Sequence, residues 1–240
     1  MMNQLNEIAK LIDHSLLHPM MRDSELIDGC KIAMKYNVAS VCIKPYAVAM
    51  AKEFLDGSEV AVGTVVGFPH GNSSVEIKKE ETIRAIHDGA TEIDMVINIG
   101  KALSKDWGYV HKEIEEIMAV CRLENVILKV IFENDFLPAD EFKINLCTIC
   151  NEVKVDYVKT STGFGFVKSA NGGYDYRGAT THDIKLMKNR SIPEIKVKAA
   201  GGIRTFRDFL KFKKLGVSRM GVSATEKIMK EAKDYYKMHG

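Results

Sequence analysis

The chain has 240 residues, a length that suits one large domain or two small ones. Hydrophobic residues make up 46% of it and charged residues 28%, and the net charge is only +2. So small a net charge gives little reason to expect nucleic-acid or membrane partners, although a small anion held by local groups would suit it. No apolar run approaches the roughly 18 residues that span a bilayer. The first ten residues lack the apolar block of a signal peptide, so a cytoplasmic protein is expected.

Five cysteines form an odd set without the spacing of a secreted, disulfide-bonded domain, so reduced thiols are expected. Cys147 and Cys150 form a C-x-x-C pair that would lie on one helix face. Because no second pair and no nearby histidine accompany them, core packing is favoured over a redox or metal role.

Short apolar runs alternate along the chain with amphipathic stretches of helical period. Eight runs are candidate strands: 11–13, 38–43, 60–66, 92–97, 126–132, 155–160, 195–199 and 217–222. The spacing of their starts is that of a β-α unit.

Two of the intervening stretches have residues typical of helix ends. The stretch 73–87 stops before Gly89, a suitable C-cap, while 205–215 begins at a possible N-cap, Thr205, and closes on Gly216. Eight β-α units without a break in composition favour a closed barrel over a doubly wound sheet. The sequence therefore predicts a single α/β domain over residues 1–240, a (β/α)8 TIM barrel with an N-terminal helical segment.

Polar residues recur at the ends of these strands, where a barrel has its catalytic groups. They are Asp13, Cys42, Lys159, Lys198 and Ser223, and a further one, Asp94, lies inside the fourth run. One lysine at a strand end would most simply be solvated or salt-bridged. Two lysines on neighbouring strands, with an aspartate from a third, instead indicate a reactive site, because their side chains converge on one mouth.

This trio suits nucleophilic catalysis by an amine. Free lysine has a pKa of about 10.4, and only the unprotonated amine attacks a carbonyl. Burial and a second cation nearby lower that pKa, so one lysine would be the nucleophile and the other its activator. Asp94 could neutralise excess charge and relay protons. The alternative is a structural Asp94–Lys198 ion pair.

Glycines near the last strand ends predict an anion site. Gly201 and Gly202 follow Lys198, and Gly221 precedes Ser223. Glycine backbones and helix N-termini offer N–H donors, and barrel enzymes often bind phosphate in these loops. Gly163 could let a ligand approach the backbone after Lys159. The histidines form no ligand pattern, so no metal site is expected.

Two motifs resemble those of one known family in combination and in order. Val158 begins Val-Lys-Thr-Ser-Thr-Gly-Phe, and Lys198 begins Lys-Ala-Ala-Gly-Gly-Ile-Arg-Thr. With Val-Cys-Ile-Lys-Pro from Val41 and Glu-Ile-Asp-Met-Val-Ile from Glu92, the chain resembles the deoxyribose-phosphate aldolases over nearly its full length.

The resemblance implies reversible cleavage of 2-deoxy-D-ribose 5-phosphate to D-glyceraldehyde 3-phosphate and acetaldehyde, without metal or organic cofactor. It assigns Lys159 as the Schiff-base lysine, Lys198 as the lysine that perturbs it, and Asp94 as their partner in proton transfer. The pocket residues that it implies are Asp13 and Cys42, with Gly163, Gly201, Gly202, Gly221 and Ser223 at the phosphate. A homodimer or homotetramer is plausible.

Two positions depart from the pattern of the family. Ala224 stands where many members have a second serine, and the loop over 169–178 is longer than usual.

Two alternative functions remain. One is another class I or transaldolase-like barrel acting on a different phosphorylated sugar. The other is a barrel that binds a sugar phosphate without turning it over.

Overall fold

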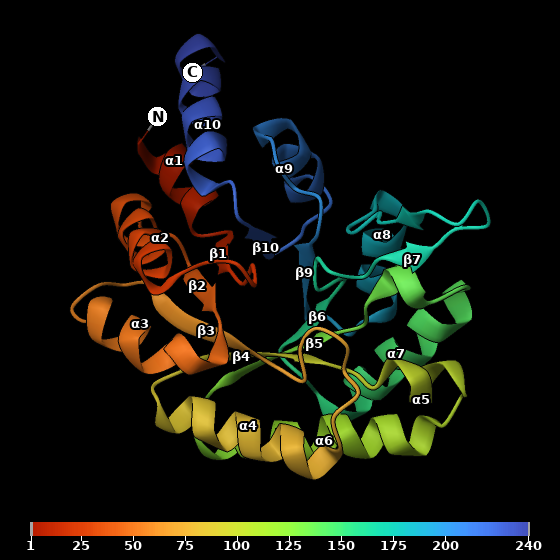
Figure 1. Cartoon of the computed structure of the whole chain (residues 1–240). Helices are drawn as coiled ribbons and strands as arrows, with labels where there is room; N and C mark the ends of the chain where they lie inside the picture. The colour runs from red at the N-terminus through yellow and green to blue at the C-terminus, as the bar shows by residue number, and fades with distance from the viewer. Residues whose placement is uncertain (1, 240) are drawn as a thin grey trace.

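The computed structural model describes residues 2–239. Eight parallel strands close into a barrel in the order β1-β10-β9-β6-β5-β4-β3-β2 (Figure 1). Their bounds are β1 Ile12–Leu16, β2 Ser40–Ile43, β3 Ala61–Val66, β4 Glu92–Val96, β5 Ile127–Ile131, β6 Tyr157–Lys159, β9 Lys196–Ala200 and β10 Arg219–Val222. The predicted barrel is therefore confirmed, and each strand overlaps its predicted run.

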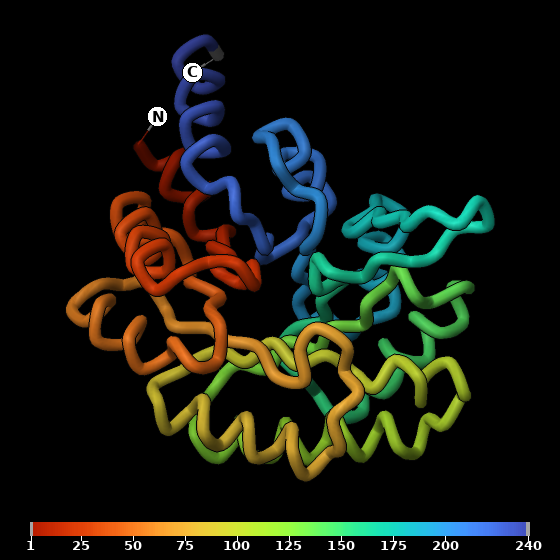
Figure 2. Tube along the Cα trace, viewed as in Figure 1, coloured from red at the N-terminus to blue at the C-terminus, as the bar shows by residue number. Residues whose placement is uncertain are grey.

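Helices surround the barrel and connect its strands. They are α1 Met2–Ala9, α2 Asp23–Tyr36, α3 Val48–Phe54, α4 Val75–His87, α5 Ile99–Leu103, α6 Trp107–Leu123, α7 Asp140–Val153, α8 Thr181–Arg190, α9 Phe206–Lys213 and α10 Thr225–His239. Helix α1 is the predicted N-terminal helical segment. It contacts α10, so the first and last helices lie side by side (Figure 2).

The first strand is longer than its predicted run. β1 continues through His14 and Ser15 to Leu16, because its backbone pairs with β2 as far as Ile43. Two polar residues, His14 and Ser15, interrupt the apolar pattern of this strand, so the pattern predicts only its first part. Backbone hydrogen bonding to a neighbouring strand outweighs their weak intrinsic preference.

The predicted helix signals agree with the structure. Ser74 caps α4, Thr205 caps α9, and Gly89 and Gly216 adopt the left-handed backbone that follows a helix. Helix α4 nevertheless buries Lys78, paired with Glu113 of α6, while its isoleucines Ile77 and Ile83 are exposed.

The long loop over 169–178 belongs to a small antiparallel hairpin inserted between β6 and α8. Its strands are β7 Val167–Lys168 and β8 Tyr174–Asp175. Figures 1 and 2 show its tip extending away from the barrel, while its base returns toward the strand ends.

The C-x-x-C pair lies in the core, as predicted. Cys147 and Cys150 are fully buried on α7, and burial raises the pKa of Cys147 to about 12. Such thiols stay protonated and pack as small apolar groups. None of the helices among residues 2–239 combines the length and apolar character needed to cross a membrane.

Candidate active site

The register of the barrel brings charged side chains of neighbouring strands to one level. Asp94 of β4 is the partner of Lys129 of β5, and Lys159 of β6 is the partner of Lys198 of β9. Arg219 of β10 also pairs with Lys198. Registered residues of parallel strands point to the same face of a sheet, so these side chains share the barrel interior.

One oxygen of Asp94 lies between the two predicted lysines. Its Oδ2 atom is 2.6 Å from Nζ of Lys159 and 2.7 Å from Nζ of Lys198. Its Oδ1 atom accepts a hydrogen bond of 2.8 Å from Lys129. Asp13 of β1 adds an ion pair of 2.5 Å with Lys198. All of these side chains are at most 3% exposed, so burial and the neighbouring charges together control their protonation.

Glu92 completes a buried charge cluster, at 2.6 Å from Lys129 and 3.1 Å from Arg219. The basic members are Lys129, Lys159, Lys198 and Arg219, and the acidic members are Asp13, Glu92 and Asp94. If Lys159 is uncharged, three cations face three anions. Because an unbalanced buried charge is costly, the cluster favours the neutral amine of Lys159.

The pKa shifts of the two lysines also favour a neutral Lys159 beside a charged Lys198. Burial lowers the pKa of Lys159, and Lys198 lowers it further against the opposing effect of Asp94. Burial alone would also lower the pKa of Lys198, but Asp13 and Asp94 raise it above its usual value. The site thus pairs an amine that loses its proton readily with an ammonium that keeps it, an arrangement suited to nucleophilic attack.

Replacing Lys129 by methionine is expected to lower the free energy of unfolding by about 3–5 kcal/mol, the usual loss when one partner of a buried ion pair is removed. Lys129 contacts both Glu92 and Asp94, which would lose a shared cation. Urea unfolding at pH 7 measures the change. Lys168→Met, at an exposed position of the hairpin, is the control. Equal losses in the two variants would contradict the charge-balance argument.

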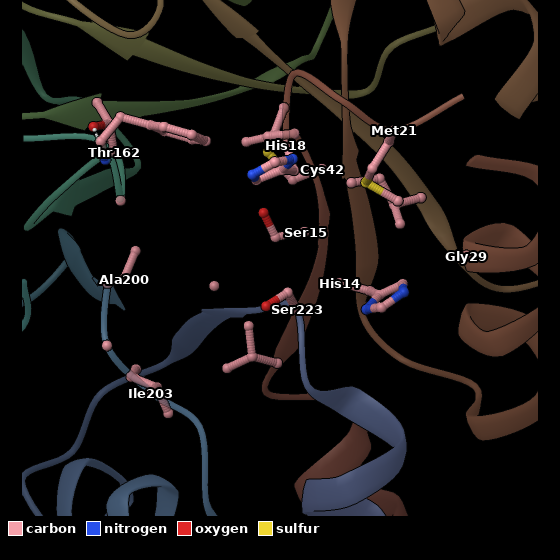
Figure 3. A pocket seen from close by; sticks show the side chains of 18 of the residues that line it. His14, Ser15, His18, Met21, Gly29, Cys42, Thr162, Ala200, Ile203 and Ser223 are labelled. Atoms are coloured by element: carbon pink, nitrogen blue, oxygen red, sulfur yellow. Dashed lines mark hydrogen bonds between the residues drawn. The ribbon is translucent and has the colours of Figure 1, made fainter. Parts of the chain in front are cut away.

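A cavity of about 730 Å³ opens at the end of the barrel where β6, β9 and β10 finish. Lys159, Lys198 and Cys42 line it, and burial raises the pKa of the Cys42 thiol. Figure 3 shows the side chains of Ser15 and Ser223 projecting into the cavity, near the ends of β1 and β10. Two hydroxyls and two lysine side chains therefore face one open cavity.

Glycine turns form another wall of the cavity. Gly163, Gly201 and Gly202 line it with φ of 95°, 95° and 76°, a backbone region that other residues rarely adopt. Gly221, within β10, and Ser223, two residues before α10, also line it. Backbone N–H groups at such turns and at a helix N-terminus bind anions. This wall could hold a phosphate group.

Glu133 supports the turn that follows Lys159. Its carboxylate accepts a hydrogen bond of 3.1 Å from the backbone N–H of Thr162 and a short one from the Thr162 hydroxyl. Burial raises the pKa of Glu133 to about 7. Residues 162–163 are thereby held at the cavity by a side chain at the end of β5.

The structure brings the predicted site residues to one end of the barrel. Those that line the cavity are Cys42, Lys159, Gly163, Lys198, Gly201, Gly202, Gly221 and Ser223. Asp94 and Asp13 lie in the charge cluster, against the two lysines. The two lysines therefore lie between the cavity and the carboxylates of Asp94 and Asp13.

Several members of this site were not predicted from the sequence. Glu92 and Lys129 interrupt apolar strands, and Glu92 lies two residues from Asp94, on the same strand face. That alternation was a usable signal. No such sequence signal marks Arg219, Ser15 or Glu133, because the contacts that place each of them in the site are with residues far away in the chain.

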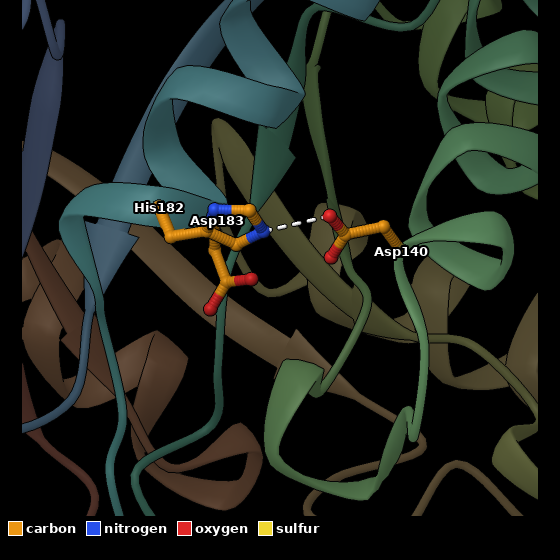
Figure 4. Close-up of side chains that lie close together, drawn as sticks. All are labelled: Asp140, His182 and Asp183. Carbon is orange, nitrogen blue, oxygen red and sulfur yellow. Dashed lines mark hydrogen bonds and ion pairs between the residues drawn. The ribbon is translucent and has the colours of Figure 1, made fainter.

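A second cluster lies where α7 and α8 begin. Asp140, His182 and Asp183 place potential metal-ligand atoms within 4.8 Å of one another (Figure 4). The ammonium of Lys143, however, is 2.5 Å from Asp183 and 3.0 Å from Asp140. Since Lys143 already pairs with both carboxylates and His182 with Asp140, we interpret the cluster as an ion-pair network at two helix N-termini.

Comparison with known proteins gives one consistent result. Residues 7–231 match the family model described as DeoC/LacD family aldolase. A deoxyribose-phosphate aldolase of Rhodopirellula baltica is 44% identical over 230 residues, which cover 96% of this chain and 91% of the relative.

Two solved structures share the fold closely. A Coccidioides immitis protein, provisionally assigned as a deoxyribose-phosphate aldolase, has a TM-score of 0.87 and 34% identity, over 95% of this chain and 87% of its own. The deoxyribose phosphate aldolase of Aeropyrum pernix, described as a unique tetramer, has a TM-score of 0.85 and 25% identity, over 96% and 93% of the two chains.

Proposed function

The chain belongs to the DeoC/LacD family of aldolases, and from this premise we propose that it is a deoxyribose-phosphate aldolase. It would cleave 2-deoxy-D-ribose 5-phosphate reversibly to D-glyceraldehyde 3-phosphate and acetaldehyde. The observation that best supports this reaction is the buried amine of Lys159, whose pKa is lowered beside the Lys198 ammonium.

Lys159 is the proposed nucleophile. Its Nζ atom attacks the aldehyde carbon C1 of the open-chain sugar, and uptake of one proton with loss of water leaves a protonated Schiff base. This step places a positive charge where the neutral amine stood. The Asp94 carboxylate, 2.6 Å from Nζ, stabilises that charge.

The carbon–carbon bond then breaks between C2 and C3. A base removes the proton of the C3 hydroxyl, and the bonding electrons move into the iminium group to give an enamine. Glyceraldehyde 3-phosphate departs, C2 takes up a proton, and water releases acetaldehyde from Lys159. Asp94 and Lys198 share a hydrogen bond of 2.7 Å and are the proposed proton carriers for these steps.

The phosphate of the substrate is proposed to bind at the glycine turns. Gly163, Gly201, Gly202, Gly221 and Ser223 line the cavity that also contains the two lysines. Asp13 would act indirectly by holding Lys198, and Cys42 would contribute a neutral wall. Lysine, aspartate and water suffice for the reaction, so we propose no metal or organic cofactor.

Borohydride trapping tests this assignment. Incubation with 2-deoxyribose 5-phosphate and sodium borohydride, followed by peptide mass mapping, is expected to give a reduced adduct on Lys159. Release of acetaldehyde from the same substrate separates this enzyme from aldolases of other sugars and from a barrel that only binds. The peptide with the exposed Lys168 reports non-specific labelling. An adduct on Lys198 alone, or none, would overturn the roles of the lysines.

We also propose that the whole chain is one catalytic domain that works in the cytoplasm as a homodimer or homotetramer. The match to the family model over residues 7–231 supports the first point, and the five free, buried cysteines suit a reducing compartment. The tetramer described for the Aeropyrum pernix relative supports an oligomer, whose mass light scattering would determine.

A further inference from the structure

The inserted hairpin brings a tyrosine to the wall of the cavity. Tyr176 directly follows β8 and lines the same space as Lys159 and Lys198. Its hydroxyl is buried and has no hydrogen-bond partner among residues 2–239. A buried hydroxyl that has lost water without gaining a partner is unfavourable, and such groups in native proteins call for an explanation.

The surroundings of this hydroxyl are the glycine turns. A Cβ atom added to Gly201 would lie 2.0 Å from the Tyr176 Oη atom, and one added to Gly163 would lie 3.7 Å from it. The hydroxyl therefore stands between the turns that follow β6 and β9. Their backbone is the proposed phosphate-binding wall.

The tyrosine is held firmly in this place. Asp135 accepts hydrogen bonds of 3.0 and 2.9 Å from the backbone N–H groups of Arg177 and Gly178, the two residues that follow it. The next N–H group, that of Ala179, donates to the carbonyl of Gly201 at 3.1 Å. The tyrosine ring packs against Phe166, with ring centroids 5.6 Å apart.

The hydroxyl can act only as a neutral group near neutral pH. Burial raises the pKa of Tyr176, and Glu133 and Asp135 raise it further. A protonated phenol offers one hydrogen-bond donor. Arg204, which lines the same cavity, adds a positive charge to this side of the site.

We propose that Tyr176 is a further substrate-binding residue, whose hydroxyl donates a hydrogen bond to a phosphate oxygen held at the Gly163 and Gly201 turns. This assignment rests on the proposed function. It gives the inserted hairpin a role in recognising the phosphorylated end of the substrate.

Tyr176→Phe, which removes only the hydroxyl, tests the proposal. For 2-deoxyribose 5-phosphate, kcat/KM is expected to fall about tenfold, or about 1.4 kcal/mol, mainly through KM. For unphosphorylated 2-deoxyribose, kcat/KM should not change. The matched control is Tyr174→Phe on the same hairpin, where the side chain is 69% exposed and both substrates should be unaffected.

Each alternative result has a distinct meaning. Equal losses for both substrates, or no loss for either, would overturn the hydrogen bond to phosphate while leaving the aldolase activity of the wild type established. A folded wild-type protein that releases no acetaldehyde from either substrate would overturn the proposed function and, with it, the role of Tyr176. Thermal unfolding of both variants verifies that they remain folded.

Discussion

Lys159→Leu is expected to reduce aldol cleavage by about 10⁴-fold or more, comparable to the loss of other enzymes deprived of their nucleophile. Without the amine, no Schiff base forms, and no neighbouring group can replace it. Lys198 is close enough, but it stays protonated beside Asp13 and Asp94. Release of acetaldehyde and borohydride trapping should both be lost.

The fold of this variant should survive. Asp94 keeps its hydrogen bonds to Lys129 and Lys198, and leucine replaces an amine that is proposed to be neutral. The control is Lys168→Leu, at an exposed position, which should retain full activity. Substantial turnover by a folded Lys159→Leu protein would refute the covalent mechanism.

Lys198→Leu is expected to lower kcat by about 10²–10⁴-fold, the usual contribution of a group that assists proton transfer. The variant should also change the dependence of activity on pH. Lys198 lowers the pKa of Lys159, so its removal raises that pKa and leaves Asp94 to favour the protonated form further. Because only the neutral amine attacks, the acidic limb of the kcat/KM profile should move to higher pH.

The matched control for Lys198→Leu replaces another lysine of β9. Lys196→Leu, at the exposed start of β9, should leave both rate and profile unchanged. The measurement is kcat/KM against pH for the three proteins. A Lys198→Leu profile whose acidic limb stays in place would show that Lys198 does not set the pKa of Lys159.

The fold followed from short-range features of the sequence. Buried strands of a parallel barrel are apolar on both faces, so they stand out as apolar runs, while caps such as Thr205 mark helix ends. Among the barrel strands, only β1 was partly hidden, since His14 and Ser15 interrupt it. Its extent depends on pairing with β2, a contact that local composition does not encode.

The proposed reactive residues were also visible in the sequence, because charged groups within or at the ends of apolar strands are costly unless they are paired or used. Lys159, Lys198 and Asp94 were found for this reason, and their assignment to roles came from the family resemblance. Asp13 was expected at the pocket, and the structure instead places its carboxylate against Lys198 in the buried cluster.

The sequence by itself thus determined the barrel and the two candidate lysines, because strand periodicity and residue type are properties of single segments. Only the tertiary structure decided the charge state of the site. Register across the strands brings Lys129 within hydrogen-bond distance of Glu92 and Asp94, and Arg219 within that distance of Glu92 and Asp13. With these side chains the buried positive and negative charges are equal in number when the amine of Lys159 is neutral. Likewise, the role proposed for Tyr176 depends on the contact of the hairpin with the Gly201 turn, which joins residues distant in the chain.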